Sequence, residues 1–383
     1  MIPKKQLHAK DLHHISMTTF MEHLSLDIQG YRCDTEMLFS VLTKAALDNG
    51  SLESACDDLA DVADGNTLRE QLNAALDVAD LQRQEAEMNA ALVADLPAEL
   101  PRDGVEVAID FHDEPFYGKT PEMRTYTCRD RAKKGTTRFF RIASASVMWR
   151  GIRLTLALTY VLPEYSTLDV VQCLFRRLQR RGFQMTVLYL DKGFCCGEVI
   201  RYLQAVGQKA VLACPIRGKT GGTRALCRGR KSYRTTYTFT GGTTADMAVV
   251  ATLPPGKSGK RHRKWLLFVV IGLDWSPKKV KQRYRRRFGI ESTYRQRRQM
   301  RVSSTTRNPA VKFFLMGLSL VLVNIWARLR WQCFRRPGRG PRTVLVAAFK
   351  LKRFINLLRR AIEDVYATIV AVPITGPRQI VIY

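Results

Sequence analysis

Apolar and polar residues alternate in different ways along this chain, and the first pattern predicts helices. In residues 34–90 apolar side chains recur at the spacing of one helix face, with short polar turns between them. One predicted helix begins at Asp34-Thr35-Glu36 and ends at Asp48-Asn49-Gly50. Ser51 caps the next helix, and Gly65-Asn66-Thr67 begins a third. We therefore predict an N-terminal all-α domain over residues 1–100.

A second pattern, typical of strands, begins at residue 105 and predicts an α/β domain over residues 103–330. The proline-containing segment Leu96–Pro101 forms the predicted boundary before it. The predicted strands are Val105–Phe111, Arg138–Val147, Ile152–Leu162, Met185–Leu190 and Lys209–Cys214. The predicted helices are Thr167–Arg181 and Glu198–Val206. The resulting order, β-β-β-α-β-α-β, indicates a sheet flanked by helices.

Residues 216–262 show a third pattern, punctuated by paired glycines and prolines. Within them Tyr233–Thr240 and Met247–Leu253 alternate like exposed antiparallel strands. We expect a β-rich insertion here. After it, Lys264–Leu273 returns to the pattern of a buried strand, and Ser276-Pro277 begins a helix with serine as its cap.

The most apolar run of the chain is Phe313–Ala327. It is flanked by Lys312 and Arg328 and contains Asn324, so its uncharged length is about 15 residues. A bilayer requires about 20. A buried core helix is the better interpretation, and residues 331–383 follow it as a basic C-terminal extension.

Charge is divided unevenly along the sequence, which carries a formal net charge of +28. Residues 1–100 hold 7 Lys and Arg against 18 Asp and Glu, a net of −11, and the remainder carries +39. So large a surplus points to nucleic acid, or less often to a membrane surface. The acidic N-terminal helices fit a helix-turn-helix that reads DNA and a partner-binding or packing domain about equally well.

The cysteines indicate a reduced protein. Nine are present, with irregular spacing and no pair separated by two residues, which argues against a structural zinc site. The first residues, Met1-Ile2-Pro3-Lys4-Lys5, lack an apolar signal core. We expect an intracellular, cytoplasmic protein.

Three carboxylates carry the candidate chemistry. Asp110 and Asp191 each close an apolar run, and Glu291 lies in the most basic stretch of the chain. A carboxylate at the end of a buried strand is costly unless a cation sits against it. Three of them in so basic a protein predict a site for two Mg²⁺ ions, for which Mn²⁺ could substitute, acting on a polyanion. Asp110 would bridge the two ions, and Asp191 and Glu291 would each complete one coordination sphere.

The alternative to a metal site is that each carboxylate forms a local salt bridge with a purely structural role. For any single one of the three that alternative is strong, and it weakens for all three together. Asp113 and Glu114 rank second as ligands, because they lie past the apolar run, in an expected loop.

The segment around Glu291 combines this acid with a dense positive charge. Between Lys278 and Arg301 there are 11 Lys and Arg and a single acid. Tyr284, Arg287, Glu291 and Arg298 are spaced to share one helix face. That face predicts a phosphate clamp beside the metal, with the tyrosine stacking on a base or touching a phosphate. The predicted DNA-binding residues are Tyr284, Arg287, Arg298, Lys192 and Arg295.

These motifs resemble the DDE transposases of the insertion-sequence-four group. The array Tyr284-x2-Arg287-x3-Glu291-x6-Arg298 is similar to the group's Y-x2-R-x3-E-x6-K array, with arginine in place of the final lysine. Asp191-Lys192-Gly193-Phe194 resembles its second-Asp motif. Asp110 with Phe116-Tyr117-Gly118 looks like the first-Asp motif of the related halobacterial ISH-type branch, and Asn308-Pro309 like the tail of such domains. The resemblance covers roughly residues 103–330.

The resemblance implies an RNase H-like fold with a β-rich insertion between the second Asp and the Glu. It also implies cut-and-paste transposition, in which water attacks the phosphodiester at the element's end and the freed 3′-OH attacks target DNA. The implied partners are double-stranded DNA, as terminal inverted repeats and target, and a second copy of the chain in a homodimer. The implied setting is the prokaryotic nucleoid. A nuclease or resolvase on the same fold, or an inactive domesticated DNA-binding protein, remain the alternatives.

Overall fold

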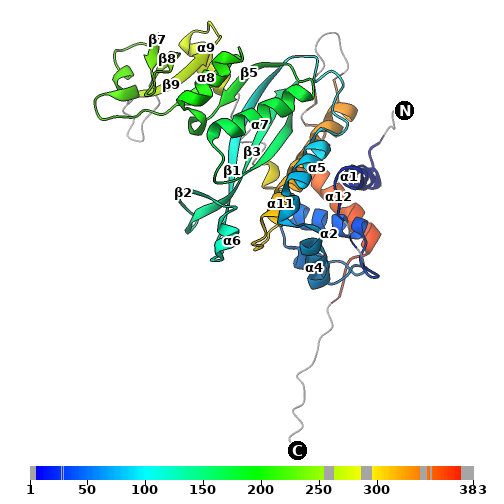
Figure 1. Ribbon diagram of the computed structural model, residues 1–383. Helices are drawn as coiled ribbons and strands as arrows, with labels where there is room; N and C mark the ends of the chain where they lie inside the picture. Colours follow the sequence, from blue (N-terminus) through cyan, green and yellow to red (C-terminus); the bar gives the residue numbers. More distant parts are fainter. Residues whose placement is uncertain are drawn as a thin grey trace, which may run out of the picture.

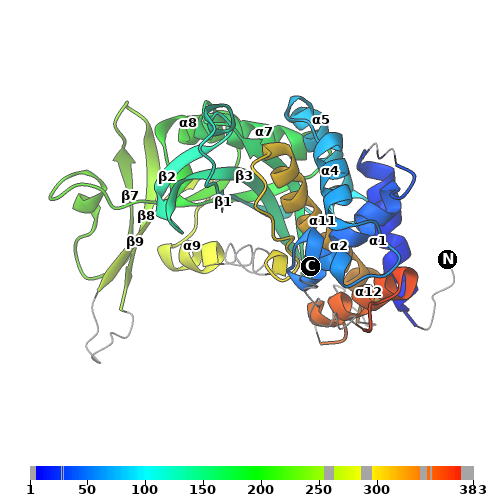
Figure 2. The ribbon, with the colours of Figure 1, turned by 90° about the horizontal axis from the view of Figure 1, so that it is seen from below.

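The computed structural model describes residues 6–26, 28, 30–253, 263–285, 296–336, 343–345 and 347–371. One mixed sheet of nine strands forms one part of the molecule, and most of the helices gather beside it (Figure 1). The first and last described helices, α1 Ala9–His23 and α12 Leu351–Tyr366, lie side by side in the helical part in both views (Figures 1 and 2).

The strands are ordered β2-β3-β1-β5-β6-β9-β8-β7, and β4 pairs with β3 beside β2. Strands β1, β5 and β6 are parallel, whereas β3 and β9 run antiparallel to their neighbours on either side of them. The strands are β1 Val105–Pro115, β2 Cys128–Lys133, β3 Thr136–Trp149, β4 Ile152–Val161, β5 Met185–Leu190, β6 Ala210–Cys214, β7 Tyr233–Thr238, β8 Thr244–Thr252 and β9 Lys264–Ile271.

The helices account for the rest of the described fold. The α-helices are α1 Ala9–His23, α2 Thr35–Asp48, α3 Leu52–Asp57, α4 Gly65–Ala75, α5 Leu81–Val93, α6 Pro121–Arg124, α7 Thr167–Arg180, α8 Gly197–Ala205, α9 Pro277–Tyr284, α11 Pro309–Cys333 and α12 Leu351–Tyr366. The short 3₁₀ helices are η1 Val78–Asp80, η2 Lys192–Phe194 and η3 Gly222–Leu226. Helices α7 and α8 cover one face of the sheet and α9 the other (Figure 2).

Most predicted elements are confirmed, because local chemistry marks their ends. Asp34 and Ser51 cap α2 and α3 by accepting backbone N–H groups, and Asn49 ends α2 in the left-handed conformation. Strand β5 has the predicted bounds, and β3 and β4 form the predicted hairpin. Strand β2 was not predicted, because four of its six residues are charged and it shows no apolar alternation.

The predicted strands of the 216–262 segment exist, but they do not form a separate layer. Strand β8 pairs with β9, and β9 pairs with β6, so β7 to β9 continue the main sheet. Met247, Ala248, Val249 and Val250 are all buried, which means that β8 is covered on both faces. The expectation of an exposed strand therefore holds for β7 and is wrong for the middle of β8.

Strand β1 is longer than predicted, and this corrects the placement of three acids. Asp110 lies inside the strand opposite Ser144, and pairing with β3 continues to Pro115. Asp113 and Glu114 are therefore strand residues, not loop residues. The strand outlasts its apolar run because both carboxylates meet arginines, as described below.

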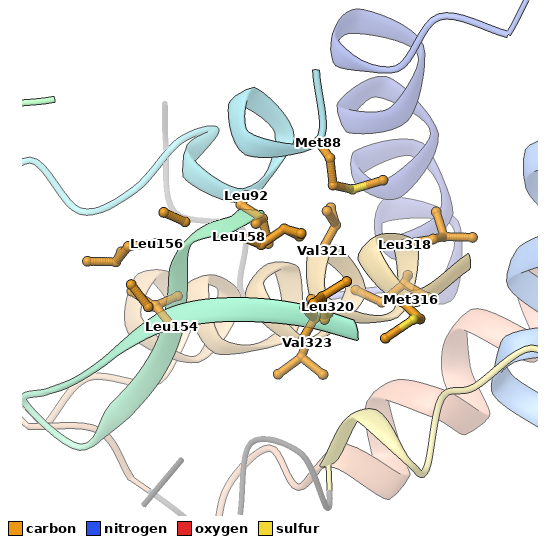
Figure 3. Close-up of a cluster of buried hydrophobic side chains, with 14 of the residues drawn as sticks. Met88, Leu92, Leu154, Leu156, Leu158, Met316, Leu318, Leu320, Val321 and Val323 are labelled. Atoms are coloured by element: carbon orange, nitrogen blue, oxygen red, sulfur yellow. The ribbon is translucent and has the colours of Figure 1, made fainter. Parts of the chain in front are cut away.

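Helix α11 confirms the prediction of a core helix over the apolar run. It is long and apolar enough to cross a membrane by length and composition, but its most apolar window is completely buried inside the protein. Leu320, Val321 and Val323 belong to one buried cluster with Leu154, Leu156 and Leu158 of β4 and with Met88 and Leu92 of α5 (Figure 3). The molecule thus has its central helix in the interface between the sheet and the helical part.

The free edge of β4 is closed by side chains in place of another strand. Asn324 of α11 accepts the Thr155 N–H at 2.9 Å and donates to the Thr155 carbonyl at 2.7 Å. Asn89 of α5 does the same for Leu158, at 2.8 Å in both directions. Two buried amides therefore satisfy backbone groups that would otherwise be stranded in the apolar core.

Candidate active site

Two of the three predicted acids meet at the centre of the sheet. Strands β1 and β5 are parallel neighbours with Ile109 opposite Leu190, so Asp110 and Asp191 follow at adjacent positions. Both carboxylates are half-buried and line the same cleft, which has a volume of about 1100 Å³. The Phe111 N–H donates to Asp110 at 3.0 Å. Two carboxylates that are 81 residues apart in the sequence thus lie at the same cleft.

Asp191 also borders a second cleft, of about 990 Å³, which it shares with Lys192, Tyr284 and Arg285. Lys192 is exposed at the start of η2. Behind the acid, the Phe194 ring stacks on Phe111 with 4.3 Å between their centres. Aromatic packing therefore fixes the turn after β5 against β1, the strand that carries Asp110.

Tyr284 corrects one prediction. Its side chain is buried among the rings of Tyr189 and Phe268, whose centres lie 6.2 and 4.9 Å away. Its hydroxyl donates to the Leu190 carbonyl at 3.2 Å and lies 3.4 Å from an Asp191 oxygen. A ring so enclosed is not free to stack on a base. It instead fastens the end of α9 to the end of β5, next to Asp191.

The rest of the predicted phosphate clamp is only partly described. Arg298 is exposed, three residues before Arg301. Glu291, Arg287 and Arg295 lie outside the described residues, so their predicted roles stay predictions. In the portion of the chain that the structure covers, no three His, Cys, Asp or Glu side chains converge as metal ligands do.

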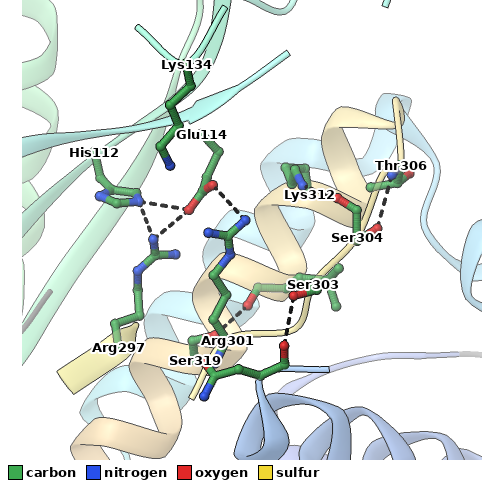
Figure 4. Close-up of polar contacts among 12 residues, drawn as sticks. His112, Glu114, Lys134, Arg297, Arg301, Ser303, Ser304, Thr306, Lys312 and Ser319 are labelled. Atoms are coloured by element: carbon green, nitrogen blue, oxygen red, sulfur yellow. Dashed lines mark hydrogen bonds and ion pairs between the residues drawn. The ribbon is translucent and has the colours of Figure 1, made fainter. Parts of the chain in front are cut away.

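A buried polar cluster formed by His112, Glu114 and Arg297 was not predicted (Figure 4). Arg297 is 1% exposed and Glu114 is 3% exposed, and their charged groups lie 2.7 Å apart. His112 contacts both partners, with its Nε2 atom 3.1 Å from the Glu114 carboxylate and close to the Arg297 guanidinium. Arg301 adds a second cation at 3.4 Å from Glu114.

The protonation of this cluster follows from its burial. Burial and the neighbouring charge of Arg297 lower the pKa of His112 to about 4, although Glu114 acts in the opposite direction. Burial alone raises the pKa of Glu114, but the bond with His112 and the charge of Arg297 outweigh it and hold the pKa well below its usual range. At neutral pH, therefore, Arg297 is the main cation facing Glu114, and His112 is neutral. One ring nitrogen can donate to Glu114 or accept from Arg297, but not both at once.

On the other face of β1, Asp113 is neutralised separately. Arg141 of β3 donates to Asp113 at 2.6 Å and to Asp130 at 2.7 Å, and Lys133 lies within 3.6 Å of both acids. Asp113 and Glu114 therefore point to opposite faces of one strand, and each meets its own arginine. Both carboxylates therefore face cations, and their second rank as metal ligands stays a prediction.

The signal that could have revealed Arg297 is weak in the sequence. A run of Arg-Gln-Arg-Arg predicts a solvated face, and burial of one of its arginines depends on an acid 183 residues earlier. Arg124, Arg129 and Arg138, which line the cleft with Asp110 and Asp191, were missed for a related reason. They lie on α6 and the β2–β3 hairpin, which the apolar pattern did not join to the site.

Comparison with known proteins supports the fold. No protein-family model matches the chain, and no curated protein matches it. Among solved structures, the chain is similar to a piggyBac transposase in a synaptic complex with hairpin DNA, determined by cryo-EM. The TM-score is 0.53 at 12% sequence identity, covering 94% of this chain and 78% of that one. The chain thus shares its mixed α/β fold with a transposase.

Proposed function

We propose that this protein is a DNA transposase that cuts at the ends of an insertion sequence and joins the freed 3′-OH to target DNA. The observation that carries the proposal is the pairing of Asp110 and Asp191 on adjacent parallel strands at a cleft lined by arginines. The transposase-like fold supports it. The motif resemblance favours the insertion-sequence-four group and its ISH-type branch.

Strand order supports an RNase H-like core within this fold. In the segment β4-β3-β1-β5-β6, the first three strands form an antiparallel meander, and β5 and β6 are parallel to β1. Helix α7 precedes β5, and α8 joins β5 to β6. This is the order that the resemblance implies. The two acids then occupy its central pair of strands, where the resemblance places the first and second Asp.

Two anchors support Glu291 as the third acid. The chain enters residues 286–295 from Tyr284, whose hydroxyl lies beside Asp191. It leaves them at Arg297, which binds His112 and Glu114 on the face of β1 that also carries Asp110. Both ends of the segment with Glu291 are thus tied to the two strands with the aspartates.

The proposed cofactor is a pair of Mg²⁺ ions held by Asp110, Asp191 and Glu291. Bound magnesium supplies an activated nucleophile and stabilises the charge that develops at phosphorus. The chain's own part is to hold Asp110 and Asp191 on adjacent strands and to bind the DNA around them. Asp110 and Asp191 fit this donor set, because hard oxygen ligands suit magnesium and both carboxylates line the same cleft.

The proposed setting is the one that the motif resemblance implies. The protein acts as a homodimer that holds two inverted-repeat ends in the prokaryotic nucleoid. A nuclease or resolvase that cuts without joining is the second candidate, favoured by the same pair of acids. Strand transfer separates the two, because only the transposase joins a pre-cut 3′-OH end to a second duplex.

The test measures cleavage of an end-containing duplex in Mg²⁺ by Asp110→Asn, Asp191→Asn and Glu291→Gln. Each variant is expected to lose more than about a hundredfold in rate, since even supporting shells of metal sites are worth 10–100-fold. DNA binding should persist. Glu164→Gln is the matched control, because this exposed acid lines the same cleft from the loop after β4. Near-normal cleavage by any of the three variants would remove that residue from the ligand set.

A further inference from the structure

Three arginines at the mouth of the cleft carry no ion pair within the described residues. Arg124 ends α6, Arg129 lies on β2 and Arg138 lies on β3. Arg129 and Arg138 are directly opposite each other in the antiparallel ladder. Like charges placed opposite each other in a sheet are destabilising. The fold therefore keeps an unfavourable cluster at this position.

The contrast with neighbouring cations in the same cleft is clear. Arg141 and Lys133 are both paired with Asp113 and Asp130. These two cations link acids on β1 and β2 and so stabilise the β1–β2–β3 region. The three arginines named above are thus distinguished by their lack of acidic partners, not merely by their charge.

Arg138 is also held in place by neutral acceptors. Its guanidinium donates to the Arg124 carbonyl at 3.3 Å and to the Thr127 hydroxyl at 3.2 Å. Burial and the neighbouring charges of Arg129 and Arg124 lower its pKa, which records the mutual repulsion of the cluster. An arginine ordered in this way loses little side-chain freedom when an anion binds.

We propose that Arg124, Arg129 and Arg138 bind the phosphate backbone of the DNA that enters the cleft toward Asp110 and Asp191. This inference rests on the proposed function, and it names a binding surface apart from the Glu291 segment. Phosphates neutralise the three charges together, and the guanidinium forks match phosphate oxygens. Binding of a polyanion relieves the repulsion among the three arginines, and this relief favours the bound state.

The test compares two triple variants of the full chain with the same loss of charge. One is Arg124→Gln/Arg129→Gln/Arg138→Gln. The control is Lys352→Gln/Arg353→Gln/Arg360→Gln, which removes three exposed cations from α12. Binding to a fluorescent end-containing duplex is measured by anisotropy over a range of salt concentrations, without divalent metal, and cleavage is measured separately in Mg²⁺.

Affinity decreases as salt increases, and we expect this dependence to become less steep when phosphate contacts are lost. The magnitude of the slope of log affinity against log salt should decrease by about 0.9 for each lost contact, hence by about 2 to 3, in the cleft variant only. Cleavage at subsaturating DNA should fall in parallel. An equal loss in the control, or an unchanged slope in the cleft variant, would overturn the inference. If the unaltered protein neither binds nor cuts the duplex, the proposed function itself fails.

Folding is checked with the double variant Arg124→Gln/Arg129→Gln, whose two side chains are exposed. It should unfold at the same temperature as the unaltered protein or a higher one, because it relieves repulsion, and still show a slope lower by about 2. A lower unfolding temperature with an unchanged slope would mean that these arginines serve the fold and not the DNA.

Discussion

At the scale of single residues, His112 shows what burial does to a titrating group. Its pKa of about 4 lies below the value of about 6.5 expected for an unfolded chain. At pH values between these two pKa values, His112 is therefore protonated in the unfolded chain and neutral in the folded protein. The stability that depends on neutral His112 is complete above about pH 6.5 and is lost as the pH falls toward 4.

We therefore expect His112 to make the free energy of unfolding fall by about 2 kcal/mol between pH 7 and pH 5. His112→Gln should flatten this part of the pH profile, measured by urea denaturation at both pH values. His14→Gln is a suitable control, because that side chain is exposed on α1. An unchanged pH profile in His112→Gln would contradict the assignment of the proton to this ring.

Arg297 makes a second residue-scale prediction. Replacing it with methionine leaves the Glu114 carboxylate buried without its closest cation, and loss of one partner of a buried pair costs about 3–5 kcal/mol. Chemical denaturation should show a loss of this size. Arg301→Met, which removes a partner that is 35% exposed, should cost much less. Adding Glu114→Gln to Arg297→Met should recover part of the loss, and an additive effect would argue against direct coupling.

Residue-scale prediction succeeded where position in an element was enough. The ends of two apolar runs located Asp110 and Asp191, and the structure brings them to one cleft. Prediction failed where a side chain's partners are distant in the sequence. Helical spacing alone predicted that Tyr284 faces the DNA. In the structure its ring faces the protein interior, where it packs against Phe268 and Tyr189.

At the scale of elements, the sealed edge of β4 explains a polar residue in an apolar helix. Asn324 completes three backbone hydrogen bonds, two with Thr155 and one with the Leu92 carbonyl. The sequence predicted the helix from its composition, but it gave no reason for the asparagine. That reason exists only when α11 lies against an unpaired strand edge.

Asn324→Leu should therefore be severely destabilising, although leucine suits the apolar surroundings. Each buried backbone group left without a partner costs about 1–3 kcal/mol, so the total should exceed about 3 kcal/mol in a denaturation experiment. Ser319→Ala is the matched control on α11, because its hydroxyl bonds to the Leu315 carbonyl of its own helix and to no strand edge among the described residues. Comparable losses in the two variants would show that the edge is not sealed in this way.

At the scale of the whole molecule, the acidic and basic regions of the sequence are not independent in space. Lys44 of α2 is 3% exposed and lies within 3.5 Å of Asp48, Asp58 and Glu363, the last on α12. One hydrophobic core runs from Leu12 to Ile362. The boundary predicted at residues 96–101 from proline content falls in the turn between α5 and β1, and sequence composition does not reveal that α5 packs on β4.

Deletion of residues 1–100 tests that boundary. It would strip Asn89 from the β4 edge and Met88 from the surface of α11. We expect the shortened protein to aggregate or to unfold without cooperativity, as followed by circular dichroism during heating. Cooperative unfolding of the remaining chain would instead support an independent N-terminal domain, and end-binding by that fragment would exclude a DNA-reading role for the helices.

The contact between the two ends also sets an order of events during synthesis. Ala60 and Asp61 donate backbone hydrogen bonds to residues 367 and 366, so the first helices wait for the last to be made. At 5–20 residues per second, that wait is on the order of 15–60 s, during which the parts of α1 and α2 that pack on α12 stay uncovered. A message cut short before α12 therefore yields a chain that cannot close its core.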